Sequence, residues 1–214
     1  MEIYSVLLEI SGPSAMWTRP DTGDAPISYP APTFAAVKGI FESILWLKQA
    51  EVVPKRVDIC RPIVFHGYTT NYGGPLRKSR LLAKGGSYQL IATVLVNVCY
   101  RLYAEIQHDA NGGAWHSGPA ANPTRTTNGA HAYVEMFNRR LVRGQLHSVP
   151  CLGWNEFVPD YAGPFRPETR VCEDINLTIP SMLKTCFPEG KQSPWRPRFL
   201  QDVTIRKGVL EYAQ

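Results

Sequence analysis

The sequence VLVNVCYRLYAEI, residues 94–106, is the stretch that most clearly predicts the fold of this chain. Every second residue is apolar from one end to the other, and the residues between them include Asn97, Arg101 and Glu105. A strict period of two is typical of a β-strand that buries one face and turns the other towards solvent or a ligand. We therefore expect a long strand here, with one face packed on a hydrophobic core.

Weaker patterns on either side of this strand predict the remaining elements. Residues 2–10 alternate as a strand, and residues 52–66 are extended and β-branched, with two prolines that favour a sheet edge. One helix is predicted to carry Pro32 in its first turn, and a second to run from about Ala130 to Arg143. The resulting β-α-β-β-α-β order is that of the ferredoxin-like α+β fold, which RNA-binding domains of the RRM type share.

The length of 214 residues, of which 44% are hydrophobic, suits one domain with an extension. We expect a ferredoxin-like RNA-binding domain over residues 1–145 and a β-rich C-terminal extension over residues 146–214. Between the predicted strands, residues 67–91 form a basic hairpin or loop excursion. This segment contains two Gly-Gly pairs and four cations, which favours an adaptable loop rather than core.

Composition also argues against several classes of protein. No apolar run is long enough to predict a membrane span, and the N-terminus has no basic region typical of a signal peptide, so we expect a cytoplasmic protein. The five cysteines have no CxxC spacing, and the histidines and acids do not cluster. We therefore expect no disulfide framework, no metal site, no cofactor and no small-molecule substrate.

The net charge of +5 is unevenly distributed, and clustered cations are typical of proteins that bind nucleic acid. Cations gather in the excursion and in the second predicted helix, and an arginine follows Trp17 and Thr18. Aromatic rings beside arginine suit single-stranded RNA. We expect these side chains to converge on one groove in the folded chain. The predicted RNA-binding residues are Arg19, Tyr29, Arg77, Lys78, Arg80, Lys84, Arg140 and Arg143.

Several segments together resemble a known family. They are MWTRPDTGDAPISYPAPTFAAVKGIFESILW at residues 16–46, RVDICRPIVF at 56–65, EMFNRRLVRGQ at 135–145 and VPCLGWNEF at 149–157. In this order they resemble the fifth family of CRISPR-associated (Cas) proteins, in its type I-C ("d") variety. The similarity spans residues 1–165.

The resemblance implies a subunit of the CRISPR RNA-guided surveillance complex Cascade. Such a subunit binds the 5′ handle of CRISPR RNA (crRNA), and its other partners are the backbone and large subunits. The family is also implied to cut precursor crRNA as a metal-independent endoribonuclease. Two alternatives remain open: a non-catalytic capping subunit whose RNA is matured by another enzyme, and a generic RNA-binding module.

The catalytic motif that the resemblance implies is incomplete in this chain. The family has a tyrosine or histidine just before the tryptophan that ends the first helix, and a Lys-His pair before the second helix. Here the first position is Leu45, which can neither donate nor accept a proton. The candidates that remain for proton transfer are His131 and Tyr133, with a nearby arginine as the cation for the phosphate.

Overall fold

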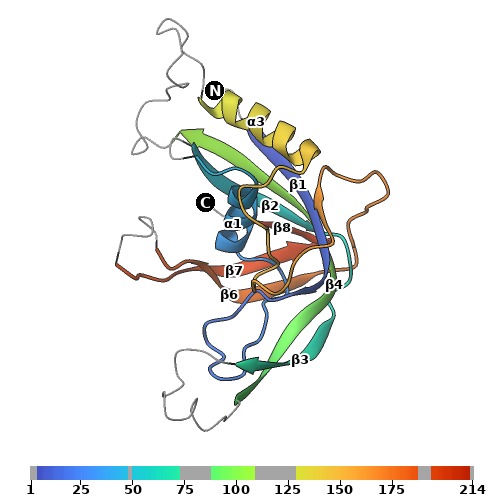
Figure 1. Ribbon diagram of the computed structural model, residues 1–214. Coiled ribbons are helices and arrows are strands. Elements are labelled where there is room, and N and C mark those ends of the chain that lie inside the picture. Colours follow the sequence, from blue (N-terminus) through green and yellow to red (C-terminus); the bar gives the residue numbers. More distant parts are fainter. Residues whose placement is uncertain (1–3, 48–49, 73–87, 109–128, 188–193, 213–214) are drawn as a thin grey trace, which may run out of the picture.

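The computed structural model describes residues 4–47, 50–72, 88–108, 129–187 and 194–212 (Figure 1). It shows helices packed on a curled antiparallel sheet, so the predicted α+β class is confirmed. Within the described part of the chain, neither helix is long and apolar enough to cross a membrane. The elements are β1 (Ser5–Ala15), α1 (Phe34–Ile44), β2 (Ala50–Ile59), β3 (Phe65–Tyr72), β4 (Tyr88–His108), α3 (Gly129–Arg143), β5 (Tyr161–Gly163), β6 (Leu177–Thr185), β7 (Arg198–Arg206) and β8 (Val209–Glu211).

The 21-residue strand β4 is the longest strand of the sheet, and neighbouring strands pair with both of its edges. Strand β1 pairs with one edge of β4 and β2 with the other, both antiparallel. Beyond β1 lies β5, and beyond β2 the sheet continues through β8 and β7 to β6. All strands after residue 145 therefore extend the sheet that the earlier strands begin, and β5 pairs directly with β1.

The alternation of apolar residues predicted for residues 94–106 is confirmed by burial. On β4, Val94, Val98, Tyr100, Leu102, Ala104 and Ile106 are each at most 5% exposed. Helices α1 and α3 cover this face of the sheet, and they also contact each other, since the rings of Phe41 and Phe137 lie 5.7 Å apart. One hydrophobic core therefore joins both helices to the long strand.

Helix α1 begins at Phe34, and the prediction that Pro32 lies in its first turn is wrong. The chain is still extended at Thr33, the N-cap, whose Oγ1 accepts a hydrogen bond of 3.3 Å from the backbone N–H of Ala36. This bond satisfies one of the amides that a helix leaves unpaired at its start, so the cap fixes the first residue. The helix ends at Ile44, and Leu45 leaves it in an extended conformation.

The other face of the sheet is crossed by residues 164–172, here named the strap. Its Phe165 ring packs edge-on against Tyr103 at 5.4 Å, and its last residue, Cys172, donates a backbone hydrogen bond to Ile59. In between, Arg166 and Thr169 bind the buried carboxylate of Glu9 on β1. RRM domains stack RNA bases on the open face of their sheet, and in this chain the strap covers the part of that face around Glu9 and Tyr103.

The excursion predicted at residues 67–91 begins and ends as a hairpin. Strand β3 pairs along its whole length with the first part of β4. Next to this hairpin, the loop before α1 is tied to β4, since Thr93 N–H donates to Pro26 and Ser28 N–H donates to Thr93. The four predicted RNA-binding cations of the excursion, Arg77, Lys78, Arg80 and Lys84, lie outside the described residues.

Candidate nucleic-acid interface

The C-terminal end of α1 meets the side of α3, in a region that is here named the α1 corner (residues 43–47, 131–143 and 145–148). It contains both predicted catalytic residues and two of the predicted cations, Arg140 and Arg143. The hydroxyl of Tyr133 donates a hydrogen bond of 2.6 Å to the backbone carbonyl of Leu45. The Nη1 of Arg140 donates to the carbonyl of Ile44 at 3.3 Å. Position 45 and helix α3, which are 88 residues apart in the sequence, are thus brought into direct contact.

Leu45 and Tyr133 both belong to the hydrophobic core. Leu45 is 4% exposed and Tyr133 is fully buried, with its ring stacked on Phe137 at 6.2 Å. Burial raises the pKa of the Tyr133 hydroxyl above its ordinary value. Because this hydroxyl is neutral and bonded to a backbone carbonyl, it holds α1 against α3. The proton-transfer role predicted for Tyr133 stays a prediction, and it would require this bond to open.

His131 differs from Tyr133 because it lies at the surface, with its side chain 56% exposed. Its Nε2 is 3.9 Å from a carboxylate oxygen of Glu135, one turn later on α3, and its ring meets Tyr4 edge-on. The imidazole is therefore accessible to a molecule that binds this side of α3. Of the two predicted catalytic residues, only His131 is placed where RNA has access to it.

The two predicted RNA-binding arginines of α3 have different surroundings. Arg140 is half-buried, and its bond to the Ile44 carbonyl puts a positive charge at the negative end of α1, which is a stabilising arrangement. Arg143 is exposed in the last turn of α3. Arg140 therefore stabilises the packing of α1 on α3, whereas the side chain of Arg143 faces solvent.

An aromatic pair at the same corner was missed by sequence reasoning, which treated His147 as an isolated residue. The backbone N–H groups of His147 and Ser148 donate to the carbonyl of Ser43 at the end of α1, each at 2.9 Å. This places the His147 ring in a stack with Trp46 at 6.5 Å, and Trp46 is 48% exposed. The two rings are about a hundred residues apart in the sequence, so no local pattern could pair them.

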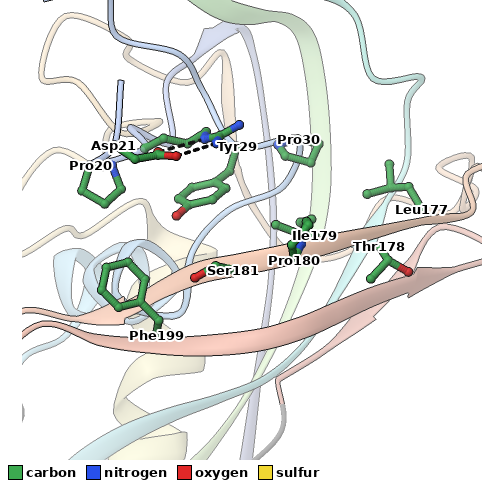
Figure 2. Close-up of a pocket in the computed structure, with 11 residues that line it drawn as sticks. Pro20, Asp21, Tyr29, Pro30, Leu177, Thr178, Ile179, Pro180, Ser181 and Phe199 are labelled. Carbon is green, nitrogen blue, oxygen red and sulfur yellow. Dashed lines mark hydrogen bonds and ion pairs between the residues drawn. The ribbon is translucent and has the colours of Figure 1, made fainter. Parts of the chain in front are cut away.

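A second group of candidates lines a pocket of about 450 Å³ between the loop before α1 and the strands β6 and β7 (Figure 2). Arg19 and Tyr29 both lie on its wall, and the guanidinium of Arg19 is 5.8 Å from the centre of the Tyr29 ring. Tyr29 is 3% exposed and accepts a hydrogen bond from the backbone of Leu183 on β6. Burial raises the pKa of the Tyr29 hydroxyl, so this ring is a fixed, neutral part of the wall.

The described candidates form two groups, one near each end of α1, and the expectation that all predicted residues share one groove stays a prediction. Tyr29 precedes the first residue of α1 by only a few positions, whereas the α1 corner lies at the other end of that helix. An α-helix of 11 residues is about 16 Å long. Figure 1 likewise shows α3 far from the hairpin of β3 and β4, beside which the loop before α1 lies.

Comparisons with known proteins give consistent results. A family model described as CRISPR-associated protein (Cas_Cas5) matches residues 5–194. The chain is 28% identical over 209 residues to the CRISPR pre-crRNA endoribonuclease Cas5d of Thermus thermophilus, covering 96% of this chain and 82% of that protein. It is 27% identical over 172 residues to the protein of the same name from Mannheimia succiniciproducens, covering 73% of this chain and 71% of that protein.

Solved structures share the fold at low sequence identity. One is a CRISPR-associated protein that superposes with a TM-score of 0.67 at 16% identity, covering 100% of this chain and 95% of that chain. Another is a chain of a CRISPR RNA-guided surveillance complex, with a TM-score of 0.54 at 16% identity, covering 97% of this chain and 90% of that chain. The resemblance stated from the sequence motifs is thereby confirmed.

Proposed function

Because the chain belongs to the Cas5d family of CRISPR-associated proteins, we propose that it binds the 5′ handle of crRNA as a subunit of Cascade. Two relatives are named pre-crRNA endoribonucleases, and one structural neighbour is part of an RNA-guided surveillance complex. The observation that carries the proposal is the contact between Tyr133 and Leu45. The resemblance assigns the position of Leu45 and the start of α3 to one site, and this contact supports that assignment.

The RNA runs past both ends of α1 in this proposal. At the C-terminal end, Arg143 supplies a positive charge and Trp46 an exposed ring, which together suit the phosphates and bases of single-stranded RNA. At the N-terminal end, Arg19 lies at the surface of the pocket. The strap supports this route, because it occupies part of the opposite face of the sheet, around Glu9 and Tyr103.

The finer description of the fold belongs to the same proposal. The four strands β5-β1-β4-β2, with α1 following β1 and α3 following β4, repeat the β-α-β-β-α-β order of the ferredoxin-like fold. This order supports a ferredoxin-like core, although its last strand comes from the predicted C-terminal extension. Backbone and large subunits of Cascade are the proposed protein partners, in the cytoplasm.

A second candidate function is cleavage of precursor crRNA, which the names of both relatives favour. In this reaction a ribose 2′-oxygen attacks the adjacent phosphorus, the bond from phosphorus to the 5′-oxygen breaks, and a 2′,3′-cyclic phosphate remains. A base must take the 2′-hydroxyl proton and an acid must give one to the leaving 5′-oxygen. His131 is the predicted catalytic residue that is exposed on α3, and an arginine nearer to it on that helix, such as the exposed Arg139, is the candidate cation for the phosphate.

One experiment separates these readings. The purified chain is incubated with its repeat hairpin RNA in EDTA, with a shuffled hairpin of equal length as the control. Tight, selective binding without a cut supports the capping subunit. Selective binding with a product that ends in a 2′,3′-cyclic phosphate supports the endoribonuclease as well. Equal affinity for both hairpins would overturn the proposal and leave a generic RNA-binding module.

A further inference from the structure

The pocket beside β6 and β7 is assembled from parts of the chain that are far apart in the sequence. Arg19, Asp21 and Tyr29 come from the loop before α1, whereas Ile179, Ser181 and Phe199 come from the two C-terminal strands. Figure 2 shows Tyr29 and Phe199 both at the edge of this space, Tyr29 from the loop before α1 and Phe199 from the side of the two strands. A volume of about 450 Å³ lies in the range of pockets that hold a small organic group.

The charge at the mouth of this pocket is balanced. Arg19 binds Asp21 through two hydrogen bonds, from Nε at 3.1 Å and from Nη2 at 2.7 Å. The carboxylate cancels most of the attraction that Arg19 alone would have for a phosphate, and it repels an anion directly. What remains is a donor beside an acceptor, a pattern that matches the edge of a nucleobase, where donors and acceptors also lie side by side.

The walls of the pocket favour a flat, apolar occupant. Three prolines, Pro20, Pro30 and Pro180, line it together with Leu177 and Ile179. Tyr29 is held in place by β6, while Phe199 is 41% exposed and so leaves part of its ring open to contact. Stacking of a base on an open aromatic ring is the main sequence-tolerant contact of proteins with single-stranded nucleic acid.

Exposed cations precede the open ring in the sequence. Arg196 and Arg198 are both exposed within three residues of Phe199, and Trp195 is 67% exposed. These arginines are suited to the phosphates on either side of a base that enters the pocket. The neutral pocket and its cationic border together fit one nucleotide of a single strand, and the positive border favours RNA over a protein segment.

We propose that this pocket receives one unpaired base of the bound RNA, stacked on Phe199 and hydrogen-bonded to the Arg19–Asp21 pair. The inference rests on the proposed function, since it assumes that the strand is crRNA. It assigns a binding role to β6 and β7, which sequence reasoning had described only as an extension. It also specifies that the RNA contact predicted for Arg19 is made with a base.

The test is a double-mutant cycle between protein and RNA. Handle RNAs that each lack one base are bound to the wild-type chain and to the F199A variant. The expected result is one position at which base removal weakens wild-type binding by about tenfold and has little further effect on F199A, because both changes delete the same contact. The matched control is F187A, since Phe187 is 44% exposed, as Phe199 nearly is, but does not line the pocket.

Three other outcomes have distinct meanings. If the wild-type chain does not prefer handle RNA to shuffled RNA, the proposed function fails. If it does prefer handle RNA but F199A behaves like F187A at every position, the pocket inference alone is overturned. If F199A binds RNA normally but no longer assembles with the other subunits of the complex, the pocket holds a protein segment, which also overturns the inference.

Discussion

At the scale of single residues, Glu9 is the carboxylate whose surroundings are most completely specified. It is fully buried on β1, and it accepts hydrogen bonds from Arg166 Nε at 2.6 Å, Arg166 N at 3.0 Å, Thr169 Oγ1 at 2.7 Å and Arg101 Nε at 3.3 Å. Burial alone would raise the pKa of Glu9, but these bonds outweigh it and hold the pKa below its ordinary value of 4.5. Glu9 is therefore an ionised anchor for the strap.

Replacing Glu9 by glutamine should destabilise the chain by about 3 kcal/mol, because two arginines lose their buried partner. Since the folded pKa is the lower one, the stability that ionised Glu9 provides is complete above pH 4.5 and is lost as the pH falls through the folded value. Urea denaturation at neutral and acidic pH measures both effects. The control E51Q removes the exposed pair of Glu51 with Lys38 and should cost less than about 1 kcal/mol. Equal losses for E9Q and E51Q would contradict this role of Glu9.

His131 and Tyr133 allow a second prediction at this scale. H131A should reduce cleavage of repeat RNA by about 100-fold or more while leaving stability unchanged, since His131 is exposed. Y133F should leave cleavage unchanged but lower stability by about 1 kcal/mol, because the Leu45 carbonyl loses its buried donor. Single-turnover cleavage and thermal melting of both variants measure this. Loss of cleavage in a stable Y133F variant would show that the tyrosine hydroxyl takes part in the chemistry.

At the scale of elements, the end of α3 carries two arginines with separable roles. R143A should leave stability unchanged, weaken handle binding by about 0.5 kcal/mol and reduce the slope of log affinity against log salt by about 0.7, as expected for one lost phosphate contact. R140A should in addition lower the melting temperature, because it removes a hydrogen bond from the end of α1. Binding titrations at several salt concentrations measure the slopes. An unchanged slope for R143A would remove this turn of α3 from the interface.

The elements also show which parts of the structure a sequence can predict. The strand β4 and the helix α3 were predicted because their apolar residues repeat at the period of their own local structure. The predicted start of α1 was two residues too early. Thr33 is the N-cap, so Pro32 lies before the first residue of the helix. The joining of β8 to β2 and the stack of Trp46 on His147 depend on contacts between distant segments, which leave no local pattern.

At the scale of the whole molecule, one sheet runs from β5 to β6, and residues beyond 145 form both of its edges. Tyr212 near the C-terminus donates a hydrogen bond of 2.7 Å to Pro32, and Leu210 is fully buried. We therefore expect the full chain to unfold in a single transition and a chain of residues 1–145 not to fold alone. Circular dichroism and calorimetry test this. A cooperative melt of the 1–145 chain would establish the domain boundary predicted at residue 145.

The central claim is that RNA lies along α1 from the pocket to the α1 corner and does not lie on the sheet. Crosslinking of handle RNA that carries photoreactive uridines, followed by mass spectrometry, tests it most directly. The account predicts crosslinks to residues 19–30 and 195–199 at one end of the helix and to residues 140–148 at the other. Crosslinks confined to the strap, residues 164–172, would contradict it.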